Sequence, residues 1–222
     1  MLYRQRRGLL LIAVAFLGNA TTASATSIEQ REYQILVEGK EVGQSNMTIT
    51  RQDDGTTVMK GDASVRISKG IINFSFSNES TEWWKDGRLI GLKAVTTENK
   101  RKTELTVSAD NNRLRLWVNN KEKPVQQDPW VNSYWKLPDA KYHNKRVPVL
   151  EVDAGREHNA LLKFVGTENM AIAGQQEKCY HFKLTGGPNA VDLWFDQYYL
   201  LVRQEFVEQG HRTVVQIKSV KR

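Results

Sequence analysis

The stretch INFSFSNESTEWWKDGRL, residues 72–89, decides the fold. Its apolar residues alternate with polar ones, and this period of two extends from Ile72 to Trp84. Such a period places alternate side chains on one face of an extended strand, whereas a helix would repeat every three or four residues. The dipeptide Asp86-Gly87 then favours a tight turn into a returning strand. The stretch therefore predicts an antiparallel hairpin.

The same alternation extends in both directions from this hairpin. Further strand-like segments are Tyr33 to Val37, Met47 to Ile49, Met59 to Ile67, Leu105 to Val107, Leu114 to Val118, Val147 to Val152, Leu161 to Val165, Lys178 to Leu184, Val191 to Phe195, Leu200 to Phe206 and Thr213 to Ile217. Turn residues such as Asn111-Asn112 separate them, and no helical pattern alternates with the strands. We therefore predict a mainly β protein with a single large curved antiparallel sheet of about a dozen strands, a half-barrel or a barrel.

The alternation is interrupted between Asn119 and Arg146. Within this interval, Asp128-Pro129 is typical of a helix start, because an acidic cap precedes proline at the first helical position. The sequence thus predicts one short helix near residues 129–136.

The N-terminal segment is typical of an export signal. Three arginines precede an uncharged run from Gly8 to Gly18, and a motif of small residues ends at Ala25, where a signal peptidase would cleave. The run is shorter than the roughly 20 residues that span a bilayer as a helix. We therefore expect a cleavable signal peptide at 1–25 and a single antiparallel β domain at 26–222. This domain would be periplasmic or secreted, with no integral membrane segment after cleavage.

Charge and composition exclude several classes of function. The net charge of the chain is +7, and removal of the three signal arginines leaves 29 Lys and Arg against 25 Asp and Glu, a net charge of +4. The charges of both signs are interspersed, so we expect no nucleic-acid partner. The lone Cys179 has a strand-like setting that favours a buried, unreactive thiol. The four histidines are not spaced as in a zinc site, and the sequence contains neither a G-x-S-x-G motif nor a glycine series that binds phosphate. We therefore predict no metal, no cofactor and no catalytic residue.

Polar residues within an apolar, inward-facing series are candidates for ligand contacts in a sheet that curls around a cavity. Glu82 and Trp84 share a face with Phe74 and Phe76 if no bulge intervenes. Two interpretations are open. Glu82 and Trp84 either contact a ligand, or end a strand that emerges into solvent beside the turn.

A second candidate group lies on a later strand, where Asp192, Trp194 and Asp196 share one face. An aromatic ring flanked by two carboxylates suits a sugar or a cation. The pattern fits an outward face equally well, with Trp194 covering a neighbouring strand and Arg203 and Glu205 pairing with the acids.

The aromatic residues of the predicted helix form the third candidate group. Trp130 and Tyr134 lie four residues apart and would stack on one side, with Trp135 beside them. A helix within an all-β chain commonly covers an open barrel end, where these rings would line a ligand site. Core filling explains them equally well, because burial of aromatic surface is itself stabilising at roughly 25 cal/mol per Å².

Four short motifs follow one another along the chain: WWKDGRL (83–89), SYW (133–135), YHFKL (180–184) and DLWFD (192–196). Their succession resembles a family of exported bacterial domains of unknown function, and the resemblance covers nearly all of the chain after the signal. In architecture such domains look like the half-barrels of periplasmic lipoprotein carriers, in which a curved sheet wraps around an apolar cavity. The resemblance implies this fold and no catalytic residue.

Three functions are compatible with these features. The apolar face and the aromatic segment favour a non-enzymatic binding or carrier protein for an apolar or amphipathic, lipid-like ligand. Trp194 between two acids favours a glycan-binding domain of the cell envelope. An enzyme of unassigned reaction would use Glu82 or Asp192 with His181 as acid and base, although no pair is fixed by spacing.

Overall fold

One continuous sheet of 15 strands runs through the computed structural model, which describes residues 26–69, 72–110 and 113–222. The predicted signal peptide and the predicted turn at Asn111-Asn112 lie outside the described residues. The strands are β1 (Ser27–Val37), β2 (Lys40–Arg51), β3 (Thr56–Lys69), β4 (Ile72–Lys85), β5 (Arg88–Glu98), β6 (Arg101–Asp110), β7 (Arg113–Val118), β8 (Lys121–Lys123), β9 (Trp130–Val131), β10 (Lys145–Glu151), β11 (Arg156–Ile172), β12 (Gln175–Thr185), β13 (Val191–Phe195), β14 (Leu201–Glu208) and β15 (His211–Lys221).

Strands that are neighbours in the sheet are also neighbours in the sequence, except that the first strand, β1, pairs with the last strand, β15. From β8 the order descends to β1, which pairs with β15, and from β15 it descends to β9. Every pairing is antiparallel except the short parallel contact between β9 and β10. The predicted single curved antiparallel sheet is therefore confirmed, with the short edge strands β8 and β9 raising the strand number above the expected dozen.

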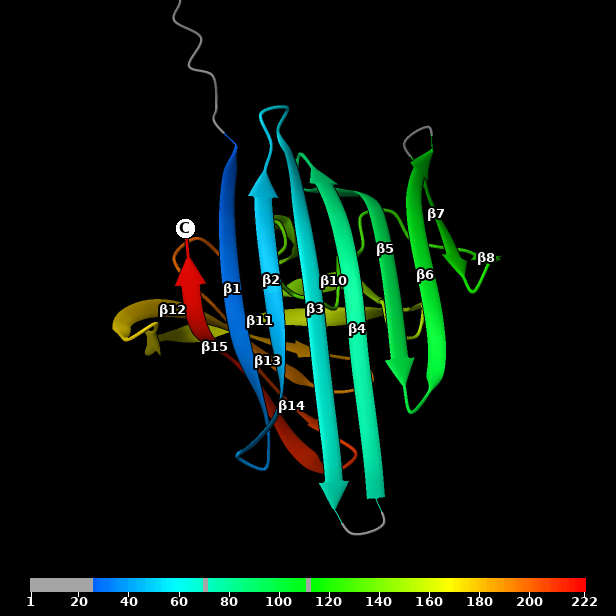
Figure 1. Ribbon diagram of the computed structural model, residues 1–222. Coiled ribbons are helices and arrows are strands. Elements are labelled where there is room, and N and C mark those ends of the chain that lie inside the picture. The colour runs from blue at the N-terminus through cyan, green and yellow to red at the C-terminus, as the bar shows by residue number, and fades with distance from the viewer. Residues whose placement is uncertain (1–25, 70–71, 111–112) are drawn as a thin grey trace, which may run out of the picture.

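The sheet is open at its edges but coils over itself. Figure 1 shows strands β1 to β7 forming one layer, with β10 to β14 crossing behind them at a steep angle. The larger core cluster fills the space between these layers and contains Tyr33, Met59, Leu162, Phe182 and Phe195, all buried. Burial of this apolar surface from both layers is what holds the coiled sheet together.

A second core cluster joins the two ends of the sheet. Leu92 and Leu116, from β5 and β7, pack in one group with Val131 and Leu150 from β9 and β10. The two edges are not hydrogen-bonded to each other, so the sheet overlaps face to face instead of closing as a barrel.

The prediction of a short helix near residues 129–136 is wrong. Trp130 and Val131 form β9, beside β10, and the described part of the chain has one helical element, the 3₁₀ turn η1 (Ala140–Tyr142). Asp128 has a φ of 57° and Tyr134 a φ of 48°, so neither a helix cap nor a continuous helix is possible there. Tertiary packing of the aromatic rings has overridden the local cap signal.

A buried ion cluster connects β1 to the turn that follows β13. Arg31 is 1% exposed and bonds the Glu29 carboxylate at 2.7 Å, the Asp196 carboxylate and the backbone oxygen of Leu201 at 2.9 Å. Asp196 also accepts the backbone N–H groups of Tyr198 and Leu200. The cluster therefore holds β1 against the turn that follows β13.

A substitution at Gly155 tests how closely the two ends of the sheet overlap, because Gly155 lies against Val118 of β7. A Cβ added there would lie 2.3 Å from a methyl carbon of Val118, whereas one added at Gly39 would have no atom within 4 Å. Both glycines have a positive φ, 57° and 76°, so alanine strains the backbone similarly at each. We expect Gly155→Ala to lower the free energy of unfolding by about 1 kcal/mol more than Gly39→Ala. Equal losses in urea denaturation would contradict this overlap.

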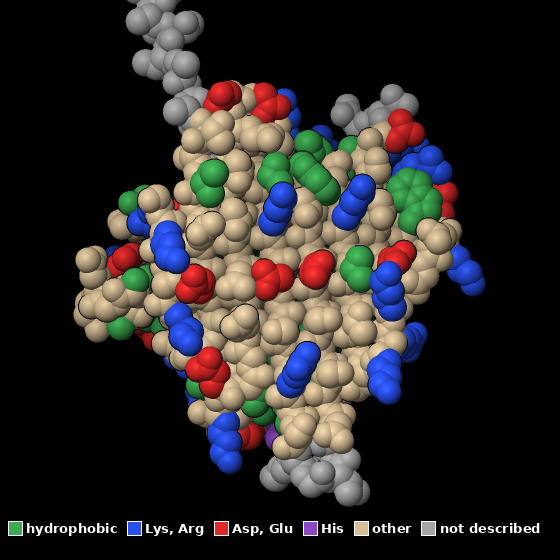
Figure 2. Space-filling view, viewed as in Figure 1, with side chains coloured by type: hydrophobic (Ala, Val, Ile, Leu, Met, Phe, Trp, Pro, Cys, Tyr) green, Lys and Arg blue, Asp and Glu red, His purple; other side chains and the backbone are tan. Residues whose placement is uncertain are grey.

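The outer face of β1 to β5 carries scattered charges of both signs and few large apolar side chains (Figure 2). This composition fits a solvent-facing sheet surface. Among the described residues, no helix has the length and apolar character needed to cross a membrane.

Candidate functional site

A cavity of about 380 Å³ lies where β4 and the β4–β5 turn meet the segment from Asp128 to His143. We call it the aromatic groove. Its lining residues are Thr57, Trp84, Asp86, Gly87, Arg88, Asp128, Pro129, Trp130, Val131, Trp135, Lys136, Leu137, Pro138, Asp139, Ala140, Lys141, Tyr142, His143, Val147 and Tyr199. The volume falls within the roughly 300–1,000 Å³ that is usual for small-molecule sites.

The groove has an apolar floor and a polar rim. Trp130, Trp135 and Val147 are buried, whereas Arg88, Lys136 and other rim residues are exposed. The Trp130 indole donates to the backbone oxygen of Lys136 at 2.9 Å, which fixes the floor ring against the segment that crosses over it. An apolar floor with polar groups at the rim suits a molecule that has both kinds of surface.

Glu82 lies directly behind the groove and organises two of its rings. The carboxylate is fully buried, and its Oε2 atom accepts the indole N–H groups of Trp84 at 2.8 Å and Trp135 at 3.0 Å. The two indoles meet edge to face, with ring centroids 6.2 Å apart. Among the described residues, Glu82 Oε1 and Ser133 Oγ have no hydrogen-bond partner of accepted geometry, although the Ser133 hydroxyl lies close enough to lower the Glu82 pKa.

Burial outweighs these hydrogen bonds and raises the pKa of Glu82 to about 7. The carboxyl is therefore poised between its neutral and ionised forms near neutral pH. The inward position inferred for Glu82 and Trp84 agrees with the structure, because β3 and β4 pair without a bulge through both residues. Glu82 supports the wall of the groove and does not itself line it.

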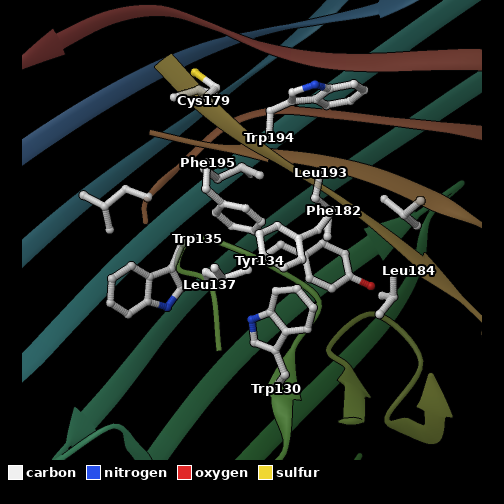
Figure 3. Close-up of a cluster of buried hydrophobic side chains, with 14 of the residues drawn as sticks. Trp130, Tyr134, Trp135, Leu137, Cys179, Phe182, Leu184, Leu193, Trp194 and Phe195 are labelled. Carbon is white, nitrogen blue, oxygen red and sulfur yellow. The ribbon is translucent and has the colours of Figure 1, made fainter. Parts of the chain in front are cut away.

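The third candidate group is divided between the groove and the core. Trp130 and Trp135 line the groove, but Tyr134 does not. Figure 3 shows the rings of Trp130, Tyr134, Phe182 and Phe195 gathered side by side, and Trp130 and Tyr134 have centroids 4.7 Å apart. The centre of the coiled sheet is thus filled by side chains, and the groove lies at its margin.

The second candidate group, Asp192, Trp194 and Asp196, does not form one site. Trp194 points away from the Phe195 ring in Figure 3, and it is buried. His181 stacks on it at 4.3 Å with planes 12° apart, and the Arg203 guanidinium lies 5.3 Å from the ring centroid. Asp192 binds His181 at 2.8 Å and Lys183 at 3.0 Å. The indole therefore presents no open face on which a sugar ring could stack.

Asp196 does not join Asp192 and Trp194 as the alternation predicted. The pairing of β13 with β14 shifts between Trp194 and Phe195, and Asp196 lies beyond the strand, bound to Arg31. The shift turns Asp196 into the buried ion cluster and away from the solvent-facing acids.

The three residues predicted as acid and base, Glu82, Asp192 and His181, do not lie together in one site. Glu82 shares the inward face with Met59 and Leu92, its direct cross-strand neighbours, whereas His181 and Asp192 lie on the opposite, outward face of β12 and β13. Cys179 is fully buried, and burial raises the pKa of its thiol to about 12, in agreement with an unreactive side chain. Within the described residues, no group of three or more His, Cys, Asp and Glu could hold a metal ion.

Sequence reasoning missed four groove residues with informative chemistry. Lys136, Tyr142 and Tyr199 line the groove, and Arg88 there pairs with Asp128 at 2.7 Å. Tyr199 has a φ of 60° in a turn, so no strand pattern marks it. For Lys136, the only signal in the sequence was its position directly after Trp135 and close to Trp130.

A family model described as "Domain of unknown function (DUF6134)" matches residues 33–218. The chain belongs to the DUF6134 family. This confirms the resemblance to a β-sheet family of unknown function. Among curated proteins, none matches the chain.

A solved structure extends the likeness of the DUF6134 chain to its fold. It is a crystal structure of a beta-barrel-like protein of the domain of unknown function DUF1849 from Brucella abortus. The TM-score is 0.62 at 7% sequence identity, and the alignment covers 87% of this chain and 97% of that chain. Identity this low shows a shared fold alone, so the function of the DUF6134 chain has to be inferred from its own groove.

Proposed function

We propose that this domain is an exported, non-enzymatic binding module that holds an apolar or amphipathic molecule in the aromatic groove. The observation that carries the proposal is the cavity of about 380 Å³, whose floor is formed by Trp84, Trp130 and Trp135. Indoles of this kind provide large apolar contact at low cost in side-chain entropy. The export signal predicted from the sequence of residues 1–25 supports action in the periplasm or outside the cell.

The preorganised floor is a second argument for binding. Trp84 and Trp135 are held by Glu82, and Trp130 is held by the Lys136 backbone, so these rings need not be ordered when a ligand arrives. Preorganisation lowers the entropic cost of association.

Two adjacent tyrosines provide a matched test of the groove. Tyr199 and Tyr198 are 46% and 54% exposed, but only Tyr199 lines the groove. We expect Tyr199→Asn to weaken binding of the neutral fluorescent probe N-phenyl-1-naphthylamine by about three- to tenfold. Asparagine tolerates the positive φ at this position, so the loss reports the ring and not the backbone. Tyr198→Asn should leave the affinity unchanged, and equal effects of the two changes, or no binding by the unmodified protein, would contradict the proposal.

A further inference from the structure

A row of three residues crosses β2, β3 and β4 and ends at Trp84 in the floor of the groove. Arg51 lies directly opposite Thr57, and Thr57 lies directly opposite Trp84. Residues paired in this way point to the same face of a sheet. Because Thr57 and Trp84 both line the groove, Arg51 is placed at the outer end of the same lining row.

Lys136 approaches this row from the opposite side. It lines the groove on the segment that crosses the Trp130 indole, and it forms an isolated bridge with Leu200. Partial burial, and then the positive charge of Arg51, lower the pKa of the Lys136 ammonium. The strand register and the groove lining thus bring one cationic side chain from β2 and one from the crossing segment to the same groove.

In the described part of the chain, no carboxylate contacts these two cations directly. Neither Arg51 nor Lys136 takes part in an ion pair within the described residues, whose ion pairs reach to 4.0 Å. Three acids and three cations line the groove, and Arg51 adds a fourth cation at the end of the row: the acids are Asp86, Asp128, which binds Arg88 at 2.7 Å, and Asp139. Cationic side chains without a direct carboxylate partner beside an apolar cavity favour an incoming anion.

We propose that the groove is selective for amphiphiles with an anionic head group, a carboxylate or a phosphate, which Arg51 and Lys136 bind. This inference rests on the proposed function, because the apolar chain of the same molecule would lie against the tryptophan floor. The guanidinium offers a planar set of donors to the anion and the ammonium adds a point charge. A quaternary ammonium ligand, which also suits aromatic surroundings, would be repelled by both side chains.

Displacement of N-phenyl-1-naphthylamine by ligands with the same chain tests the proposal. The ligands are dodecyl phosphate, dodecanoate, a neutral dodecyl polyglycol ether and dodecyltrimethylammonium, all below the concentrations at which they form micelles, with inorganic phosphate as the head group alone. We expect both anionic amphiphiles to bind about tenfold more tightly than the neutral ether, and the cationic amphiphile to bind most weakly. Inorganic phosphate should not displace the probe at the same concentrations.

The double change Arg51→Gln and Lys136→Gln should abolish this preference, so that the anionic amphiphiles bind about as tightly as the neutral ether. The double change Lys60→Gln and Lys93→Gln is the control for net charge, because it also removes two positive charges, and both lysines are exposed and pair with Thr81 on the outward face of the sheet. Equal affinity for anionic and neutral ligands, or an anion preference that survives the double change, would overturn the inference and leave the proposed function standing. Failure of every amphiphile to bind would overturn both. Displacement by inorganic phosphate as strong as that by dodecyl phosphate would contradict selection for an amphiphile and indicate a site for the free ion.

Discussion

Replacing Arg31 by methionine is expected to lower the free energy of unfolding by about 3–5 kcal/mol. Arg31 is 1% exposed, and its removal leaves the carboxylates of Glu29 and Asp196 buried without their principal cation. Methionine keeps most of the side-chain volume, so the loss reports the uncompensated charges and not a cavity. Urea denaturation at neutral pH measures the effect.

Arg222 provides the matched control for this cluster. Its side chain is 48% exposed and reaches the same two acids from the rim, at 3.3 Å from Glu29 and 4.0 Å from Asp196. Because solvent screens the contact, Arg222→Met should cost about 1 kcal/mol or less. Similar losses for Arg31→Met and Arg222→Met would show that the buried cluster does not hold β1 against the turn after β13.

The second large effect is a pH dependence that arises from Glu82. Burial raises the pKa of its carboxyl from 4.5 to about 7 in the folded protein. Below the lower value both the folded and the unfolded chain are protonated, and the stabilising contribution is fully present. Between the two values only the unfolded chain ionises, so stability falls by about 1.4 kcal/mol for each pH unit. The total loss is about 3 kcal/mol by pH 7, with little further change above it.

Glu82→Gln isolates this contribution, because glutamine resembles the neutral acid and still offers an oxygen to Trp84 and Trp135. The free energy of unfolding of the variant minus that of the unmodified protein should increase by about 3 kcal/mol between pH 4.5 and pH 7. Other carboxyl groups titrate equally in both proteins and cancel in this difference. A difference that stays constant over the interval would show that Glu82 titrates normally, which is incompatible with its buried position behind the groove.

The alternation of residues was sufficient to predict the sheet, because strand faces depend on the local period alone. The stretch from Ile72 to Trp84 lies within β4 (Ile72–Lys85), and the inward face inferred for Glu82 is the observed one. Local signals failed where a distant contact decided the backbone. Asp128-Pro129 has the residues of a helix start, yet the segment that follows pairs with β10 and packs its rings in the core. Single-sequence patterns carry no information on such contacts.

The candidate site was predicted in part for the same reason. Trp84, Trp130 and Trp135 were identified by aromatic character and strand face, and they do meet in the groove. Asp196 was misplaced because the register shift after Trp194 breaks the alternation. Arg51 continues the inward series of β2 and could have been found by extending it, whereas the approach of Lys136 depends on how the chain crosses the sheet. Placement of this kind follows only from the coiling of the whole sheet.

The six tryptophans allow a direct test of the aromatic groove as the ligand site. Trp84, Trp130 and Trp135 line the groove, whereas the other three, Trp83, Trp117 and Trp194, do not. In ¹H–¹⁵N NMR spectra, each indole N–H gives its own signal, and assigned spectra can be followed during titration with dodecyl phosphate. If the groove binds the amphiphile, the first three signals shift together with one dissociation constant while the other three stay in place. Shifts confined to Trp83, Trp117 or Trp194, or no shift at any indole, would contradict the proposal.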